Sequence, residues 1–423
     1  MSRDSVVDPA PYRALTHPPG ARFIEVLDQR ALPHVALPVK IADADTAALA
    51  IRRMWIRGAP LIGAVGAYGL ALALDRDASD ATVAKAHAAL DATRPTAINL
   101  RWALDRVRAA VAPLPVDARA DAAWREADAI CAEDAAINHA IGRVGLELLR
   151  DIARRKPGPV NVMTHCNAGA LAATAWGTAT APMFLGHAEG LPLHVWVSET
   201  RPRLQGANLT AWEMQARGVP HTLFPDVAGA LLMRRGDVDI VLVGADRVAA
   251  NGDVCNKIGT YDKALAASDN AVPFYVALPS PTLDPSIASG DAIPIETRSP
   301  DEVLAITGRD SYGQTMTVAI APPGTRAVNY AFDVTPARLV TGLVTERGSP
   351  PRGAMRWSRC SRSVFREHGR CPRRARAARC RRRDGTRDER ARHQPRQVRQ
   401  RQRAPRASRL RRLSDHADRP ALC

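Results

Sequence analysis

Short apolar runs alternate with helical stretches from residue 160 onward, and this alternation limits the possible folds more than any other feature. The apolar runs are VNVMTHC, LHVWVSE, HTLFPD, DIVLVGAD, PFYVALP and AVNYAFD, and helical stretches near 169–179, 206–218, 226–236 and 259–269 separate most of them. Strands that alternate with helices form a parallel sheet with helices on both faces. We therefore predict an α/β domain over 156–348, which opens with a Lys-Pro-Gly-Pro break at 156–159.

The residues before this break have a helical pattern. Apolar residues recur at helical spacing from about 43 to 155, after two strand-like runs at 22–28 and 33–39 that suggest a short β-hairpin. The 17-residue uncharged run at 58–74 is at the short limit for a membrane span, but it contains four glycines. We favour a buried helix that packs closely through those glycines, in a mostly helical domain over 1–155, and we expect no contact with a membrane.

Arginine dominates the last part of the chain. Residues 349–423 contain 25 Arg, no Lys and six acidic residues, whereas the preceding 348 residues hold 34 basic and 37 acidic side chains. The high net charge therefore says little about the partners of the folded part. Only six of these 75 residues are Ile, Leu, Val or Phe, so we predict a disordered tail. A frameshift near Gly348 would explain its composition, and the alternative is a genuine arm that binds RNA or another polyanion.

Several common classes of site are disfavoured by the sequence. The three cysteines before the tail, at positions 131, 166 and 255, have spacings that fit neither a disulfide framework nor a zinc cluster. No GxGxxG follows the first strand of the α/β domain and no GxxxxGK[ST] occurs, which argues against a dinucleotide or a nucleoside triphosphate. The first 20 residues lack the apolar core of a signal peptide. We expect a cytoplasmic chain that needs no metal and no cofactor.

Polar residues stand where the predicted strands end, which is the edge at which parallel sheets bind ligands. Cys166 ends the first strand, and the N-terminus of a predicted following helix would favour a thiolate that acts as base or nucleophile. A lone cysteine is more often a small buried hydrophobe, and the adjacent His165 is expected to point to the opposite face. Asp246 follows IVLVGA, where a half-buried carboxyl could be an acid catalyst. Its alternatives are a helix cap or an ion pair with Arg247.

Basic residues beside turns or helix starts suggest a phosphate site. The segment NKIGT at 256–260 combines an amide, an ammonium group and the N–H groups of a predicted helix N-terminus. Arg201, Arg203 and Gln205 precede another predicted helix, and the segments RGAP at 57–60 and RPT at 94–96 place arginines beside structure-breaking residues. Each alone fits a surface charge, but together they favour a phosphorylated small molecule.

Six segments, in this order, resemble the methylthioribose-1-phosphate isomerases of the methionine salvage pathway. They are IRGAPLIGAVGAYG, RPTAINL, THCNAGALA, SETRPRLQGANLTAWE, VGADRVAANGDVCNKIGTYDKA and PFYVALPSPTLD. Relatives of those enzymes include the alpha, beta and delta subunits of eukaryotic initiation factor 2B and the ribose-1,5-bisphosphate isomerases. The resemblance covers about residues 20–347. It implies a small helical N-terminal domain, a Rossmann-like second domain, and a homodimer.

The resemblance also implies the site residues. The family's catalytic cysteine corresponds to Cys166 and its catalytic aspartate to Asp246, a pair that the translation-factor relatives generally lack. Its substrate-binding positions correspond to Arg57, Gly58, Ala59, Arg94, Gln205, Asn256 and Lys257.

The reaction implied by the resemblance converts 5-methylthioribose 1-phosphate, an aldose, into 5-methylthioribulose 1-phosphate, a ketose. The 1-phosphate prevents simple opening of the ring, so an acid, assigned to Asp246, would protonate the ring oxygen. Cys166 would then act as the base on an enolate route or stabilise the transition state of a hydride shift, and both routes stay open. Two alternatives remain, namely a related substrate such as 5-deoxyribose 1-phosphate and a non-catalytic regulatory or nucleic-acid-binding protein that uses the basic tail.

Overall fold

The structure is a computed structural model that describes residues 8–94 and 98–349. Within these residues, the first part is a small antiparallel sheet followed by five helices. The sheet has the order β1–β2–β3, with β1 at Leu15–Thr16, β2 at Ile24–Leu27 and β3 at Pro38–Ile41. The helices are α1 (Ala44–Arg52), α2 (Ala59–Leu74), α3 (Asp80–Asp91), α4 (Ile98–Val111) and α5 (Val116–Ala153). The predicted hairpin is β2 with β3, although the second strand lies later than expected, since only residues 38 and 39 of the predicted run 33–39 belong to β3. The predicted helical stretch is α1 to α5.

Helix α2 is the uncharged run, and it lies buried among the other helices. It packs against α1, α3, α4 and α5. At Gly63 a side-chain Cβ would lie only 2.8 Å from the backbone carbonyl oxygen of Asn99 on α4, so a larger residue would push the two helices apart. The prediction of a buried helix packed through its glycines is confirmed. None of the helices in the described part of the chain is long and apolar enough to cross a membrane.

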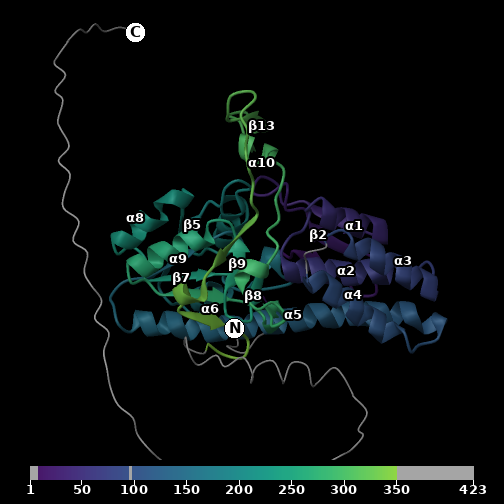
Figure 1. The fold of residues 1–423 in the computed structure, drawn as a ribbon. Helices are drawn as coiled ribbons and strands as arrows, with labels where there is room; N and C mark the ends of the chain where they lie inside the picture. The colour runs from purple at the N-terminus through teal and green to yellow at the C-terminus, as the bar shows by residue number, and fades with distance from the viewer. Residues whose placement is uncertain (1–7, 95–97, 350–423) are drawn as a thin grey trace, which may run out of the picture. The chain divides into compact units, whose positions relative to one another are not determined.

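Helix α5 takes part in two hydrophobic cores. Its first half packs on α2 and α4, and its second half packs on α6 (Ala181–Ala188), as Figure 1 shows. Trp124 and Ile130 belong to the core of the helical part, whereas Ile141 and Leu149 belong to a core under the parallel sheet. The domain boundary predicted near residue 155 stays a prediction, because this helix contributes to the cores on both sides of it.

The second part is built on a six-stranded parallel sheet with the order β15-β10-β7-β4-β5-β6. Its strands are β4 (Val160–Thr164), β5 (Leu193–Ser198), β6 (His221–Phe224), β7 (Ile240–Val243), β10 (Phe274–Ala277) and β15 (Gly342–Val344). The chain moves outward from β4 to β6 and then returns to lay β7, β10 and β15 on the other side of β4. The order therefore reverses between β4 and β7, the place where such sheets bind ligands.

Both faces of this sheet are covered, which confirms the predicted fold class. Successive residues of one strand enter different cores: Ile240 lies in one and Val241 in the other. The other helices of this part are α7 (Ala211–Ala216), which continues a π-helical turn at Gly206–Thr210, α8 (Gly229–Arg234), α9 (Thr260–Asp269) and the short α10 (Asp301–Leu304).

One strand assignment from the sequence was wrong. The run AVNYAFD contributes to β14 (Phe332–Thr335), which pairs antiparallel with β9 (Val254–Lys257) in a separate four-stranded sheet. That sheet also contains β8 (Arg247–Ala249) and β11 (Leu283–Asp284). The sixth parallel strand is β15, because apolar alternation marks a strand without specifying its partner. An exposed hairpin of β12 (Ala305–Arg309) and β13 (Thr315–Ala319) completes the described elements (Figure 1).

The predictions for the arginine-rich tail concern residues 349–423. Apart from Ser349, these lie outside the described residues.

Candidate active site

Cys166 and Asp246 follow the two strands that flank the reversal of the sheet. Cys166 comes two residues after β4, and Asp246 comes three residues after β7. The backbone of Cys166 is left-handed, with φ of 61°, which is uncommon for a residue with a side chain. Two hydrogen bonds hold it there: its N–H donates to Thr200 Oγ1 at 2.8 Å, and its carbonyl accepts from Thr210 Oγ1 at 2.6 Å. The sharp turn brings the buried thiol to the edge of a cavity.

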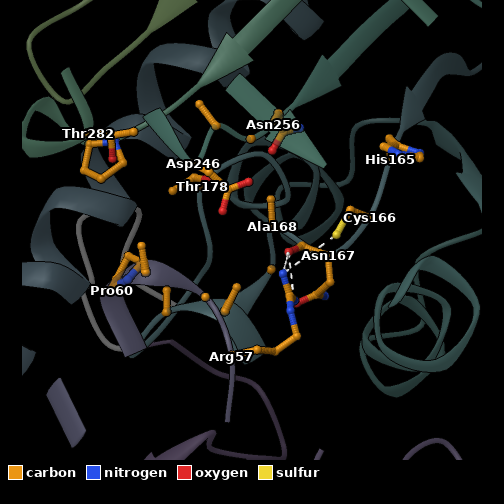
Figure 2. A pocket seen from close by; sticks show the side chains of 18 residues that line it. Arg57, Pro60, His165, Cys166, Asn167, Ala168, Thr178, Asp246, Asn256 and Thr282 are labelled. Carbon is orange, nitrogen blue, oxygen red and sulfur yellow. Dashed lines mark hydrogen bonds between the residues drawn. The ribbon is translucent and has the colours of Figure 1, made fainter. Parts of the chain in front are cut away.

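Arg57 reaches this turn from the segment before α2. Its guanidinium donates to the side-chain oxygen of Asn167 at 2.8 Å and to the carbonyl of Asn167 at 3.0 Å. Nη2 of Arg57 also lies 3.8 Å from Sγ of Cys166. Figure 2 shows these contacts as dashed lines, with Asp246 across the pocket from them. The arrangement places a fixed cation beside the thiol.

Gly58 allows this close approach. Its φ is 94°, and a Cβ at this position would lie 2.1 Å from the carbonyl oxygen of Ala172. A glycine is therefore required where the segment before α2 crosses the loop after β4.

Two adjoining cavities meet at these residues. The smaller, of about 50 Å³, is lined by Cys166, Asn167 and Asn256, and the larger, of about 340 Å³, by Arg94, Gln205 and Lys257. Both share Arg57, Gly58, Ala59 and Asp246. All nine residues expected at the site from the sequence therefore line one cavity or the other. They come from both parts of the chain, and Asp246 lies at the junction.

The larger cavity is rich in positive charge. Burial lowers the pKa of Lys257 to about 8, and burial also lowers the pKa of Arg94. Arg298 lies in the same wall, and Glu296 accepts a 3.0 Å hydrogen bond from its Nε. Burial opposes ionisation of Glu296, but Arg298 and then Arg94 outweigh it and keep its pKa below the usual value. Asp246 and the nearby Glu296 are outnumbered by the five cationic side chains that line the cavity, which are Arg57, Arg94, Arg247, Lys257 and Arg298. The excess of positive charge suits an anion such as phosphate.

Apolar side chains also line the larger cavity. They are Met54, Ile62, Ile98, Ile293, Pro294 and Phe332. A ligand that fills this cavity would meet guanidinium and ammonium groups as well as hydrocarbon. This combination suits an amphipathic small molecule.

Three details of the predicted phosphate and thiol sites were wrong. The N-terminus of α9 is already occupied by the Asp333 carboxylate, which accepts from Gly259 N at 2.7 Å and from Tyr261 N at 3.2 Å. Arg201 donates to the carbonyl of Val303, and Arg203 pairs with Glu302, so of the predicted group at 201–205 only Gln205 lines a cavity among the described residues.

The third detail concerns the helix expected after Cys166. Residues 170–172 form a single 3₁₀ turn, and α6 begins only at Ala181. The apolar composition of residues 169–179 suggested a helix, but these residues form a loop. They are apolar because the loop is buried against other elements. The positive charge near the thiol comes from Arg57, which contacts the sulfur, and from Lys257, which interacts electrostatically with Cys166.

His165 also lines the smaller cavity, but its hydrogen bond leads away from Arg57 and Asp246. Its Nε2 donates to the carbonyl of Ile258 at 2.7 Å, and burial lowers the pKa of the imidazole to about 3. The ring is therefore neutral at ordinary pH. Figure 2 shows it directed away from Arg57 and Asp246, in agreement with the sequence expectation. In the described part of the chain no group of three or more His, Cys, Asp or Glu side chains could hold a metal ion.

Sequence analysis missed Arg298, which lines the larger cavity, and Glu296, which accepts its hydrogen bond. They lie in an irregular stretch with neither a strong apolar pattern nor one of the recognised motifs. Only their spacing, with opposite charges two residues apart, could have drawn attention to them.

Comparison with known proteins places the chain in a family. The Initiation factor 2 subunit family matches residues 55–351. The methylthioribose-1-phosphate isomerase of Rhizobium meliloti (strain 1021) is 58% identical over 330 residues, which are 77% of this chain and 91% of the relative. The chain belongs to the methylthioribose-1-phosphate isomerase family. The isomerase of the same name from Methylorubrum populi is 56% identical and covers 81% of this chain and 94% of the relative.

Solved structures agree with this membership. The crystal structure of 5-methylthioribose 1-phosphate isomerase from Pyrococcus horikoshii OT3 is similar with a TM-score of 0.75 at 36% identity, covering 86% of this chain and 100% of that one. The translation initiation factor eIF-2B, subunit delta, from A. fulgidus has a TM-score of 0.69 at 34% identity, covering 81% and 96%. The prediction of an isomerase of this family is confirmed.

Proposed function

We propose that this chain converts 5-methylthioribose 1-phosphate into 5-methylthioribulose 1-phosphate. The observation that carries the proposal is that Arg57 and Asp246 line both cavities, while the thiol of Cys166 lies beside Arg57 at the edge of the smaller one. A substrate with a phosphate at one end and a methylthio group at the other suits the charged and apolar side chains that line the larger cavity. The homodimer implied by the family resemblance belongs to the same proposal, and sedimentation of the purified chain tests it.

Asp246 is proposed as the acid that protonates the ring oxygen. It lines both cavities, so a sugar bound across the junction would lie within its reach. Its backbone N–H donates to the carbonyl of Cys255 at 2.9 Å, which fixes the residue at the start of the loop after β7. A fixed acid lowers the barrier to ring opening by delivering its proton to an oriented acceptor.

Cys166 is proposed to act on the open-chain intermediate. As a base it would remove the proton from C2 and return it to C1, with Arg57 stabilising the thiolate. In a hydride shift it would instead stabilise the charge that develops in the transition state. Turnover in D₂O separates the routes, because only the enolate route brings deuterium from solvent to C1 of the ketose.

A turnover assay on the purified chain tests the proposal directly. We expect ketose formation from 5-methylthioribose 1-phosphate, and loss of at least about a thousandfold in kcat for Cys166→Ser and for Asp246→Asn. Asp291→Asn, at an exposed position, is the matched control and should keep full activity. Absence of turnover by well-folded parent protein would overturn the proposal, and 5-deoxyribose 1-phosphate would be the next substrate to test.

A further inference from the structure

Glu213 is a fully buried carboxylate that contacts the loop carrying Cys166. It lies on α7 with no exposed surface, and its two oxygens accept four hydrogen bonds. The donors are the Tyr12 hydroxyl at 2.6 Å, Asn167 Nδ2 at 2.7 Å, Ala170 N at 2.8 Å and Leu171 N at 3.3 Å. Burial raises the pKa of Glu213, and the hydrogen bond from Tyr12 and those from Asn167 and Leu171 oppose that rise. Three of the four donors belong to residues 167–171.

The contact with Asn167 determines which way its side-chain amide faces. Nδ2 must point to Glu213, because a carboxylate can only accept, and Oδ1 then faces Arg57 and accepts from Nη1 at 2.8 Å. The opposite orientation of the amide would place an NH₂ group against the guanidinium and an oxygen against the carboxylate. Arg57 in turn contacts Sγ of Cys166. A chain of oriented contacts thus runs from Glu213 through Asn167 to the thiol.

We propose that Glu213 is a positioning residue that acts through Asn167 to hold the Arg57 guanidinium beside the Cys166 thiol. Glu213 lines neither of the two cavities, so it acts without touching the substrate. Gly169 shows how tightly the loop is held, because a Cβ there would lie 2.3 Å from Oε1 of Glu213. Of the two tests below, only the kinetic one rests on the proposed function, and the alkylation test does not.

The same carboxylate also anchors the N-terminal segment, and the test must separate the two roles. Tyr12 donates to Glu213 and accepts from Arg217 Nε at 3.1 Å, while Arg217 forms a buried ion pair with Asp8 at 2.8 Å. Tyr12→Phe removes the donor from this side and leaves Asn167 in place. If Glu213 served only to anchor the N-terminal segment, Tyr12→Phe would have the same effect as Glu213→Gln. Tyr12→Phe is therefore the control.

A double-mutant cycle provides the kinetic test. We expect Glu213→Gln to lower kcat about 10- to 100-fold, because a misplaced group near the reacting atoms costs this much, and Tyr12→Phe to cost far less. In an Asn167→Ala background the further loss on Glu213→Gln should fall below about threefold, since the pathway is already broken. Losses that multiply in the double variant would overturn the proposal, as would an equal loss from Tyr12→Phe.

Alkylation of Cys166 by iodoacetamide gives a readout that needs no turnover. A thiol beside a guanidinium reacts faster as its thiolate fraction rises, so Glu213→Gln should slow labelling at least about threefold, and Arg57→Lys should slow it similarly. Cys131 reports loosening of the fold, because it lines neither cavity and burial raises its pKa to about 12, which keeps it unreactive. Unchanged labelling of Cys166, or faster labelling of Cys131 together with Cys166, would contradict the proposal even if the parent chain turned out to act on another substrate.

Discussion

The guanidinium of Arg57 lies 3.8 Å from the sulfur of Cys166, although the two residues are 109 positions apart in the sequence. Arg57 precedes α2 in the helical part, and Cys166 follows β4 of the parallel sheet. The contact therefore closes the cavity between the two parts and supplies positive charge where the proposed chemistry needs it. Three donor contacts to Asn167 keep the guanidinium in one orientation.

Replacement of Arg57 by lysine tests whether this orientation matters beyond charge. Lysine keeps the positive charge but cannot contact Asn167 and the sulfur at once through a planar fork. We expect kcat/KM to fall about 100-fold, as for the loss of one fixed donor at a reacting centre. Arg52→Lys, at the exposed end of α1, is the control and should leave both constants unchanged. Full activity of Arg57→Lys would show that charge alone suffices.

Lys257 gives the site a predicted pH dependence. Burial lowers its pKa to about 8, so the ammonium is present below that pH and is lost as pH rises through it. A phosphate dianion binds the charged form, so KM should rise above pH 8 and approach a tenfold increase per pH unit. His165 adds no step near pH 6.5, because burial lowers its pKa to about 3.

Initial rates between pH 7 and 9.5 check this prediction, since the substrate phosphate is then fully ionised. Lys257→Met should raise KM at every pH and remove the step near pH 8. A step of the same size in Lys257→Met would assign it to another group.

The parallel sheet and the nine expected site residues, all of which line a cavity, could be found from the sequence because those features depend on local pattern. Cys166 and Asp246 stand directly after apolar strands, and the ends of adjacent parallel strands meet at one edge. Periodicity and strand-end position are readable from a few neighbouring residues. Recognition of the family motifs added the roles that position alone could not assign.

Features that depend on distant pairing were missed. Asp333, 74 residues along the chain, accepts a hydrogen bond from Gly259 N at the start of α9. Its carboxylate therefore occupies the helix N-terminus that the sequence predicted as a phosphate site. Arg298 enters the cavity wall from an irregular segment, where it pairs with Glu296, and no local pattern marks either residue. The buried loop after Cys166 has helix-like composition, but its backbone is held by Glu213, whose contact no local pattern could reveal.

Gly58 is predicted to be essential for stability as well as for the shape of the site. In Gly58→Ala the new Cβ would overlap the carbonyl oxygen of Ala172 at 2.1 Å, in a backbone conformation with φ of 94°. We expect the free energy of unfolding to fall by at least about 3 kcal/mol. Gly20→Ala is the matched control, because its φ is 72° but nothing lies within 4 Å, and it should cost about 1 kcal/mol. Equal costs in urea denaturation would refute the close approach.

The arginine-rich tail should be dispensable, whereas the strand shortly before it should not. A chain ending at residue 349 keeps β15, which pairs with β10, and keeps Glu346, which accepts a 3.0 Å hydrogen bond from Ser280 N. Its Tm and turnover should match those of the full chain. A chain ending at residue 340 loses β15, uncovers the edge of β10 and removes Leu343 and Val344 from two cores, so it should fail to fold. If the chain ending at 349 folds but loses turnover, the tail takes part in function, and binding of RNA by the full chain alone would identify it as a polyanion-binding arm.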